Sequence, residues 1–95
     1  MQIMKRMKGW SFMDLNATIE LMTSDDYKER FKAEYHQTNI RYKKLLNMIK
    51  KAEAGTLDFT LDCPLSLLKK QSSVMANYLT LLDKRARIEG VDLSV

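Results

Sequence analysis

Apolar and aromatic positions recur at helical spacing through the middle of the chain. Between residues 25 and 53 they alternate at intervals of four and three, a heptad pattern that predicts a helix packed lengthwise against another. Ser24 is suited to cap the start of this helix, and Gly55 can adopt the left-handed conformation that ends it. The positions of the stripe are Phe31, Tyr35, Thr38, Tyr42, Leu45, Ile49 and Ala52.

A second stripe with the same alternation predicts a helix over residues 64–89. Pro64 fits the first helical turn, where its missing N–H costs nothing, and Gly90 can end the helix. Two helices of similar length joined by a short connection pair antiparallel. Leu57, Phe59 and Leu61 in the connection are expected to plug the end of this hairpin. The positions of the second stripe are Leu68, Gln71, Met75, Tyr78, Leu82, Arg85 and Glu89.

Residues 1–22 form a basic and amphipathic extension ahead of the hairpin, which occupies residues 23–95. Phe12, Leu15, Ile19 and Met22 share one helical face, which predicts a short helix. Both long stripes are wider than a two-helix seam requires. Either the N-terminal helix or a second chain covers the remainder. We expect an all-α protein that assembles into a helical-bundle oligomer, because so short a chain often needs association to be stable.

The composition fits this architecture. The 95 residues include three Gly and one Pro, too few for a many-stranded β fold with its frequent turns. Cys63 is the single cysteine, so no disulfide can form within a monomer, which suits a reducing cytoplasm. No apolar run approaches the ~20 residues needed to span a bilayer. Neither a membrane nor a signal peptide is expected, and the predicted location is the cytoplasm of the host cell.

The sequence offers little for catalysis. His36 is the single histidine, and no second His or Cys lies at metal-ligand spacing. Asp25, Asp26 and Glu29 are explained by the start of a helix, where carboxylates complement the dipole. No nucleophile, base and oxyanion partner can be assembled from the chain. We therefore predict a protein that is not an enzyme and that uses no cofactor and no metal.

Charge points to an anionic partner. The formal net charge is +4, and antiparallel pairing brings Lys50 and Lys51 close to Lys69 and Lys70 at the loop end of the hairpin. Lysines on exposed helix positions are common, so this group can be a solvated face. The alternative is an anion site.

Three polar residues interrupt the second stripe at intervals of seven. Gln71, Tyr78 and Arg85 therefore lie along one line of the helix. Polar residues at such positions can fix the register between chains. They can instead line a pocket in which the tyrosine stacks on a base and the arginine binds a phosphate.

Residues 25–92 resemble a family of small bacteriophage and prophage proteins related to a crAss-like phage protein. The resemblance rests on Tyr27-Lys28-Glu29-Arg30 at the start of a long charged helix and on the spacing of the second stripe. It implies a phage accessory protein of the kind that often blunts host defence. Some of those proteins are oligomeric helical sponges that sequester cyclic nucleotide signals.

The leading hypothesis is therefore a non-catalytic phage accessory protein that counters host antiviral defence. It would bind a cyclic or linear nucleotide-type signal between subunits and sequester it, with Gln71, Tyr78, Arg85 and the four lysines as ligand-binding residues. One alternative is a helical module that binds and inhibits a host defence protein. Another is a weak nucleic-acid-binding protein that uses the Lys50, Lys51, Lys69 and Lys70 group.

Overall fold

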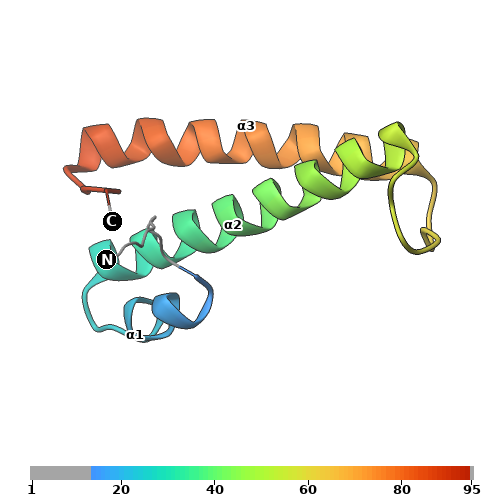
Figure 1. The fold of residues 1–95 in the computed structure, drawn as a ribbon. Coiled ribbons are helices and arrows are strands. Elements are labelled where there is room, and N and C mark those ends of the chain that lie inside the picture. Colours follow the sequence, from blue (N-terminus) through green and yellow to red (C-terminus); the bar gives the residue numbers. More distant parts are fainter. Residues whose placement is uncertain (1–13, 95) are drawn as a thin grey trace, which may run out of the picture.

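The computed structural model describes residues 14–94, and all regular structure in that range is helical (Figure 1). A short 3₁₀ helix η2 (Asn16–Thr18) leads into α1 (Ile19–Met22). Two long helices follow, α2 (Tyr27–Ala54) and α3 (Leu65–Glu89). The all-α fold with two long helices is as predicted, and the bounds of the long helices agree with the sequence prediction to within two residues.

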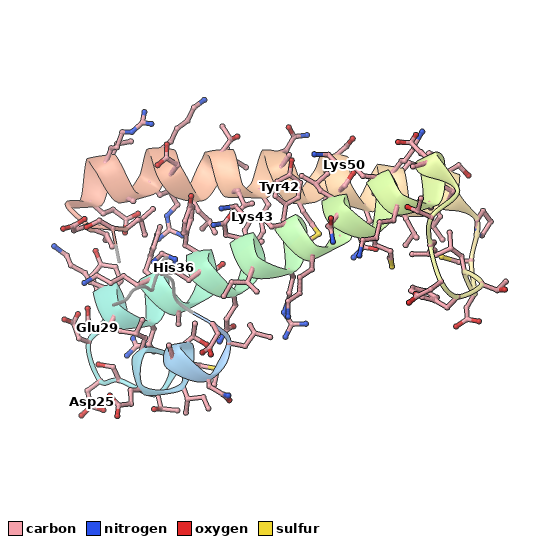
Figure 2. The ribbon with its side chains drawn as sticks, viewed as in Figure 1. Asp25, Glu29, His36, Tyr42, Lys43 and Lys50 are labelled. Atoms are coloured by element: carbon pink, nitrogen blue, oxygen red, sulfur yellow. The ribbon has the colours of Figure 1, made fainter. Side chains whose placement is uncertain are left out.

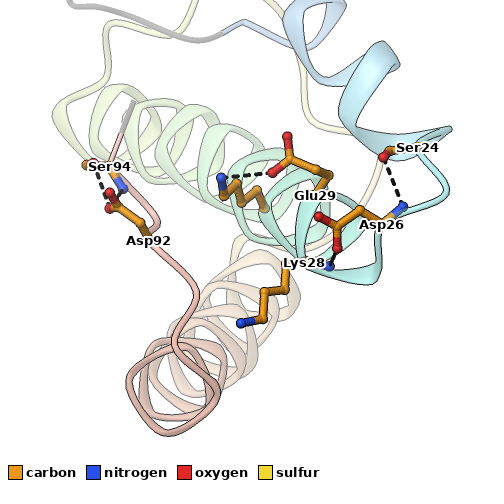
Figure 3. A network of polar contacts seen from close by, with 7 residues as sticks. Ser24, Asp26, Lys28, Glu29, Asp92 and Ser94 are labelled. Carbon is orange, nitrogen blue, oxygen red and sulfur yellow. Dashed lines mark hydrogen bonds and ion pairs between the residues drawn. The ribbon is translucent and has the colours of Figure 1, made fainter.

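The start of α2 is fixed by side-chain capping (Figure 3). The Asp26 carboxylate accepts a hydrogen bond of 2.9 Å from the Lys28 backbone N–H, which lies in the first turn and has no partner within the helix. Ser24 Oγ accepts a 3.1 Å bond from the Asp26 N–H. The capping residue is thus Asp26 rather than the predicted Ser24, which supports the turn ahead of it.

Both long helices end at a glycine with a left-handed backbone. Gly55 has φ 73° and Gly90 has φ 72°, a conformation that other residues adopt at a cost. After Gly90 the chain turns back on α3, and the Val91 N–H donates to the Ala86 carbonyl at 2.8 Å. The turn directs residues 91–94, here called the tail, toward the interior of the hairpin.

The hairpin is V-shaped, and the tail lies in its open end. Figure 1 shows α2 and α3 close together at the loop end and separating toward the opposite end, where the tail lies between them. Val91 is buried there against Phe31 of α2 and against Leu82 and Ala86 of α3. The main apolar core therefore includes the tail.

The predicted stripe of α2 is confirmed. Phe31, Leu45 and Ile49 are buried, and the stripe's other positions are half-buried. The predicted stripe of α3 is wrong at three positions, because Gln71, Tyr78 and Arg85 are exposed. The residues of α3 that lie on its buried side, here called the inner stripe, are Leu68, Ser72, Met75, Leu79, Leu82, Ala86 and Glu89.

The error on α3 has a simple geometric cause. Successive residues of a helix are rotated by about 100°, so a step of three or four can follow either of two neighbouring stripes. The predicted stripe stepped from one to the other. Its Leu68, Met75, Leu82 and Glu89 belong to the inner stripe, and the three polar residues belong to the next stripe around the helix.

Helices η2 and α1 pack against α2, so a short helix does precede the hairpin, but its predicted apolar face is wrong because Ile19 and Met22 are exposed. Thr18 is buried, and its hydroxyl accepts a 2.9 Å hydrogen bond from Gln37 Nε2. Phe12, the first residue of that prediction, lies outside the described residues. In the connection, Leu57 and Leu61 are half-buried but Phe59 is exposed, so the predicted plug is wrong for Phe59. None of the described helices has both the length and the apolar character needed to cross a membrane.

Candidate ligand-binding surface

The predicted ligand-binding residues are exposed and fall into two groups. Gln71, Tyr78 and Arg85 follow one another along α3, each about 10.5 Å further along the axis. The lysine group, Lys50, Lys51, Lys69 and Lys70, is exposed at the loop end, where α2 finishes and α3 begins. The centre of the lysine group is separated from Arg85 by more than four turns of α3, so one small ligand cannot contact both Arg85 and the lysine group in a single chain.

Arg85 is held in place by two neighbours. Its Nε donates to Glu89 Oε2 at 2.7 Å, and its Nη2 donates to Glu89 Oε1 at 3.2 Å. The guanidinium carbon lies 4.7 Å from the centre of the Phe31 ring, a cation–π arrangement. The two bonds to Glu89 do not use Nη1, whose N–H groups can still donate to an anion. Arg85 is therefore pre-positioned, although Glu89 offsets its charge.

Tyr27 completes this cluster from the start of α2. Its hydroxyl donates to Glu89 Oε1 at 3.2 Å across the open end of the hairpin. The hydrogen bond with Arg85 lowers the pKa of Glu89, and the same contact raises the pKa of Arg85. Partial desolvation and the bond to Glu89 raise the pKa of Tyr27. At neutral pH the cluster thus presents a neutral phenol beside a charged carboxylate and guanidinium.

An ion pair joins the two long helices beside the lysine group. Lys69 of α3 pairs with Glu53 of α2, which brings the last turn of one helix against the first turn of the other. Figure 2 shows Lys50 on the last turns of α2, near the start of α3. Glu53 neutralises one of the four cations. The other three lysines outnumber Asp58 and Asp62, the exposed carboxylates of the connection, so this end of the hairpin keeps a small excess of positive charge.

His36 lies in α2, in the wide part of the hairpin (Figure 2), and is buried. Its Nε2 has no hydrogen-bond partner among the described residues. Burial lowers the pKa of this imidazole, a backbone hydrogen bond with Leu93 of the tail opposes that shift, and the charge of Lys32 adds to it. The side chain is a neutral part of the interior and does not belong to the exposed surface.

Tyr27, Phe31 and Glu89 were not predicted from the sequence as parts of the Arg85 cluster. The Arg85–Glu89 spacing of four residues is a detectable signal for an ion pair on one helix. The contribution of α2 could not be read in the same way, because it depends on how the two helix ends are aligned. Within residues 14–94 no group of three His, Cys, Asp or Glu is placed to hold a metal ion.

The fold and this surface define a class of small helical-hairpin proteins that present arginine, tyrosine and lysine on exposed helix faces. The sequence of residues 25–88 matches the Sequestin family, and the chain belongs to that family. The match spans α2, the connection and almost all of α3. No curated protein and no solved structure matches the chain.

Proposed function

We propose that this protein is a non-catalytic phage accessory protein that sequesters a nucleotide-type signal between subunits and so counters host antiviral defence. The observation that carries the proposal is the exposed line of Gln71, Tyr78 and Arg85, in which an aromatic ring lies between a guanidinium and an amide. The family name Sequestin agrees with a protein that binds and retains a ligand.

The chemistry of the line suits a nucleotide. The Tyr78 ring offers a face on which a base can stack, and such stacking contributes about 1–3 kcal/mol per base. Arg85 Nη1 can donate to a phosphate oxygen while Nε and Nη2 hold Glu89. Gln71 can donate and accept through its amide, but it lies about 21 Å from Arg85 along the axis, so in a single chain only a ligand longer than one nucleotide can contact both. The lysine group adds a positive field that attracts an anion over longer range.

Calorimetric titration of the full chain with cyclic dinucleotides and short linear oligonucleotides tests this function. We expect heat and thermal stabilisation with at least one of them. Arg85→Gln should weaken that binding by about tenfold to a hundredfold, because a charge-assisted hydrogen bond contributes roughly 1.5–3 kcal/mol. The matched control is Arg87→Gln on the same helix, where the arginine pairs with Asp83 instead. The proposal is rejected if no nucleotide binds, or if both variants weaken binding equally.

A second function, binding and inhibition of a host defence protein, is favoured by a different observation. The line that carries Tyr78 and Arg85 also carries exposed Leu67, Val74 and Leu81, and apolar exposure of this kind is common in protein interfaces. In that case a protein partner from host lysate would be captured by the wild-type chain, and Val74→Glu would abolish the capture without affecting the fold.

The lysine group favours weak nucleic-acid binding as a third possibility. Its affinity would fall steeply with salt, because binding releases counterions from the phosphate backbone. Gel shifts at low salt that remain negative would exclude it. A positive shift should be lost in a variant in which Lys50 and Lys70 are both replaced by Gln.

A further inference from the structure

One face of α3 carries four large apolar side chains that the chain leaves open to solvent. Leu67, Val74, Leu81 and Ile88 are 54%, 66%, 58% and 85% exposed. They recur every seven residues, and Gln71, Tyr78 and Arg85 fill the alternate positions. We call these seven residues the outer stripe. Its spacing of four and three is the heptad pattern that packs against another helix.

The outer stripe is displaced from the inner stripe by one residue along its whole length. Each of its members directly precedes an inner residue, as Val74 precedes Met75 and Leu81 precedes Leu82. A displacement of one residue is a rotation of about 100° around the helix. Helices in a four-helix bundle have two neighbours at about this angle. The described residues supply one neighbour for α3, which is α2, and the outer stripe faces the position of a second.

We propose that a second copy of this chain occupies that position, with its own α3 packed antiparallel on the outer stripe. The stripe is complementary to itself. It is centred at Tyr78 and runs about 32 Å from Leu67 to Ile88. A two-fold axis near Tyr78 places the half with Leu67 and Val74 against the half with Leu81 and Ile88 of the partner subunit. Such an interface uses the same patch on both copies, as two-fold dimers do.

Charge favours the antiparallel arrangement over the parallel one. Parallel helices would place Arg85 opposite Arg85 of the partner subunit in the middle of an apolar seam. Antiparallel helices place Arg85 near Gln71 of the partner subunit, whose amide oxygen can accept from the guanidinium. Glu89 already balances the arginine within its own helix. Lys70 and Lys84 lie at the solvent edge, where their long side chains can reach water.

This arrangement deepens the proposed function, on which the following step rests. The dimer has two equivalent ends, and each combines Arg85 and Phe31 of one copy with Gln71 and Lys70 of the partner subunit. The two groups that lie far apart in one chain are thereby brought together. Tyr78 then lies in the seam near the axis, so each end would bind a nucleotide through the polar groups of Arg85, Gln71 and Lys70 and not by stacking on Tyr78. The site at each end is incomplete in the monomer.

Light scattering coupled to size exclusion, applied to the full chain, tests the interface. We expect twice the monomer mass, or a higher even multiple if dimers associate further. The variant Val74→Glu with Leu81→Glu buries four carboxylates in the dimer, so its dissociation constant should rise by at least about a hundredfold and the mass should fall to the monomer. The control is Phe59→Glu, an equally exposed apolar position in the connection. Circular dichroism establishes that each variant remains helical.

Cysteine cross-linking in a Cys63→Ser background tests the orientation. Tyr78→Cys lies near the axis and should form a disulfide with itself. Leu67→Cys and Ile88→Cys should each fail to do so alone, but should cross-link when the two proteins are mixed. Parallel helices give the opposite result for Leu67→Cys and Ile88→Cys, because each of these positions would then meet its own copy, whereas Tyr78→Cys pairs with itself in both arrangements.

A monomeric wild type, a double variant that keeps its mass, or self-cross-linking at Leu67→Cys would each overturn the inference. These outcomes are separate from the test of function. A dimer that binds no nucleotide rejects the proposed function and leaves the interface intact. A monomer that binds nucleotide, and that loses this binding in Arg85→Gln, overturns the interface and leaves the proposed function intact.

Discussion

Replacing Val91 by Ala tests whether the tail is part of the core. Val91 is 7% exposed and packs against Phe31, Leu82 and Ala86, which belong to both long helices. The substitution removes two buried methyl groups, each contributing about 0.8 kcal/mol, and leaves a small cavity in the open end of the hairpin. We expect a loss of about 2 kcal/mol in the free energy of unfolding. For a chain of this size that loss lowers Tm by roughly 8–15 °C.

The assay is urea unfolding followed by circular dichroism at one fixed protein concentration, since association makes stability depend on concentration. Phe59→Leu is the control, because it removes more carbon atoms from an exposed ring and should change stability by less than about 0.5 kcal/mol. If Val91→Ala stays within that same range, the tail does not stabilise the fold and is not part of its core. A loss confined to Val91→Ala supports it.

Two further predictions concern His36 and the cap of α2. Burial lowers the pKa of folded His36 below 6.5, so protons favour the unfolded chain. The stability that depends on neutral His36 is then fully present above about pH 6.5 and is lost as the pH falls toward the pKa of the folded state. The urea midpoint of the wild type should be lower at pH 5.5 than at pH 8, and this difference should be smaller in His36→Gln. An equal change in midpoint for the two proteins would contradict the prediction. Asp26→Ala should cost about 1 kcal/mol of stability through loss of the cap, whereas Asp25→Ala should cost little. Equal losses for the two aspartates would disprove the capping role.

The sequence was a good guide to the fold wherever a local signal decided the outcome. The glycines at 55 and 90 end the long helices as predicted, because the left-handed backbone at a helix end strongly favours glycine. The stripe of α2 was also read correctly, since its apolar positions have no competing stripe of similar strength. Burial of the tail could not be foreseen, because it depends on how widely the two helices separate.

The candidate surface was predicted less completely. The sequence identified Gln71, Tyr78 and Arg85 as a line of polar positions but placed them in the seam with α2. Two apolar stripes run side by side on α3, and spacing alone cannot say which one faces its own hairpin. The Arg85 cluster needed the structure, because Tyr27 and Phe31 come from a different helix whose alignment with α3 no local pattern specifies.

The one-residue offset between the two stripes of α3 has a consequence for how this gene can change. Deleting a single codon in the first turns of α3 would rotate everything after it by about 100°. The inner face would then carry Thr80 and Arg87 in place of Leu79 and Ala86, and the residues that suit α2 would turn outward. Point substitutions can be absorbed one side chain at a time, but a frame-preserving deletion would disrupt both helix contacts at once. The length of this helix should therefore vary much less among working copies of the gene than its composition.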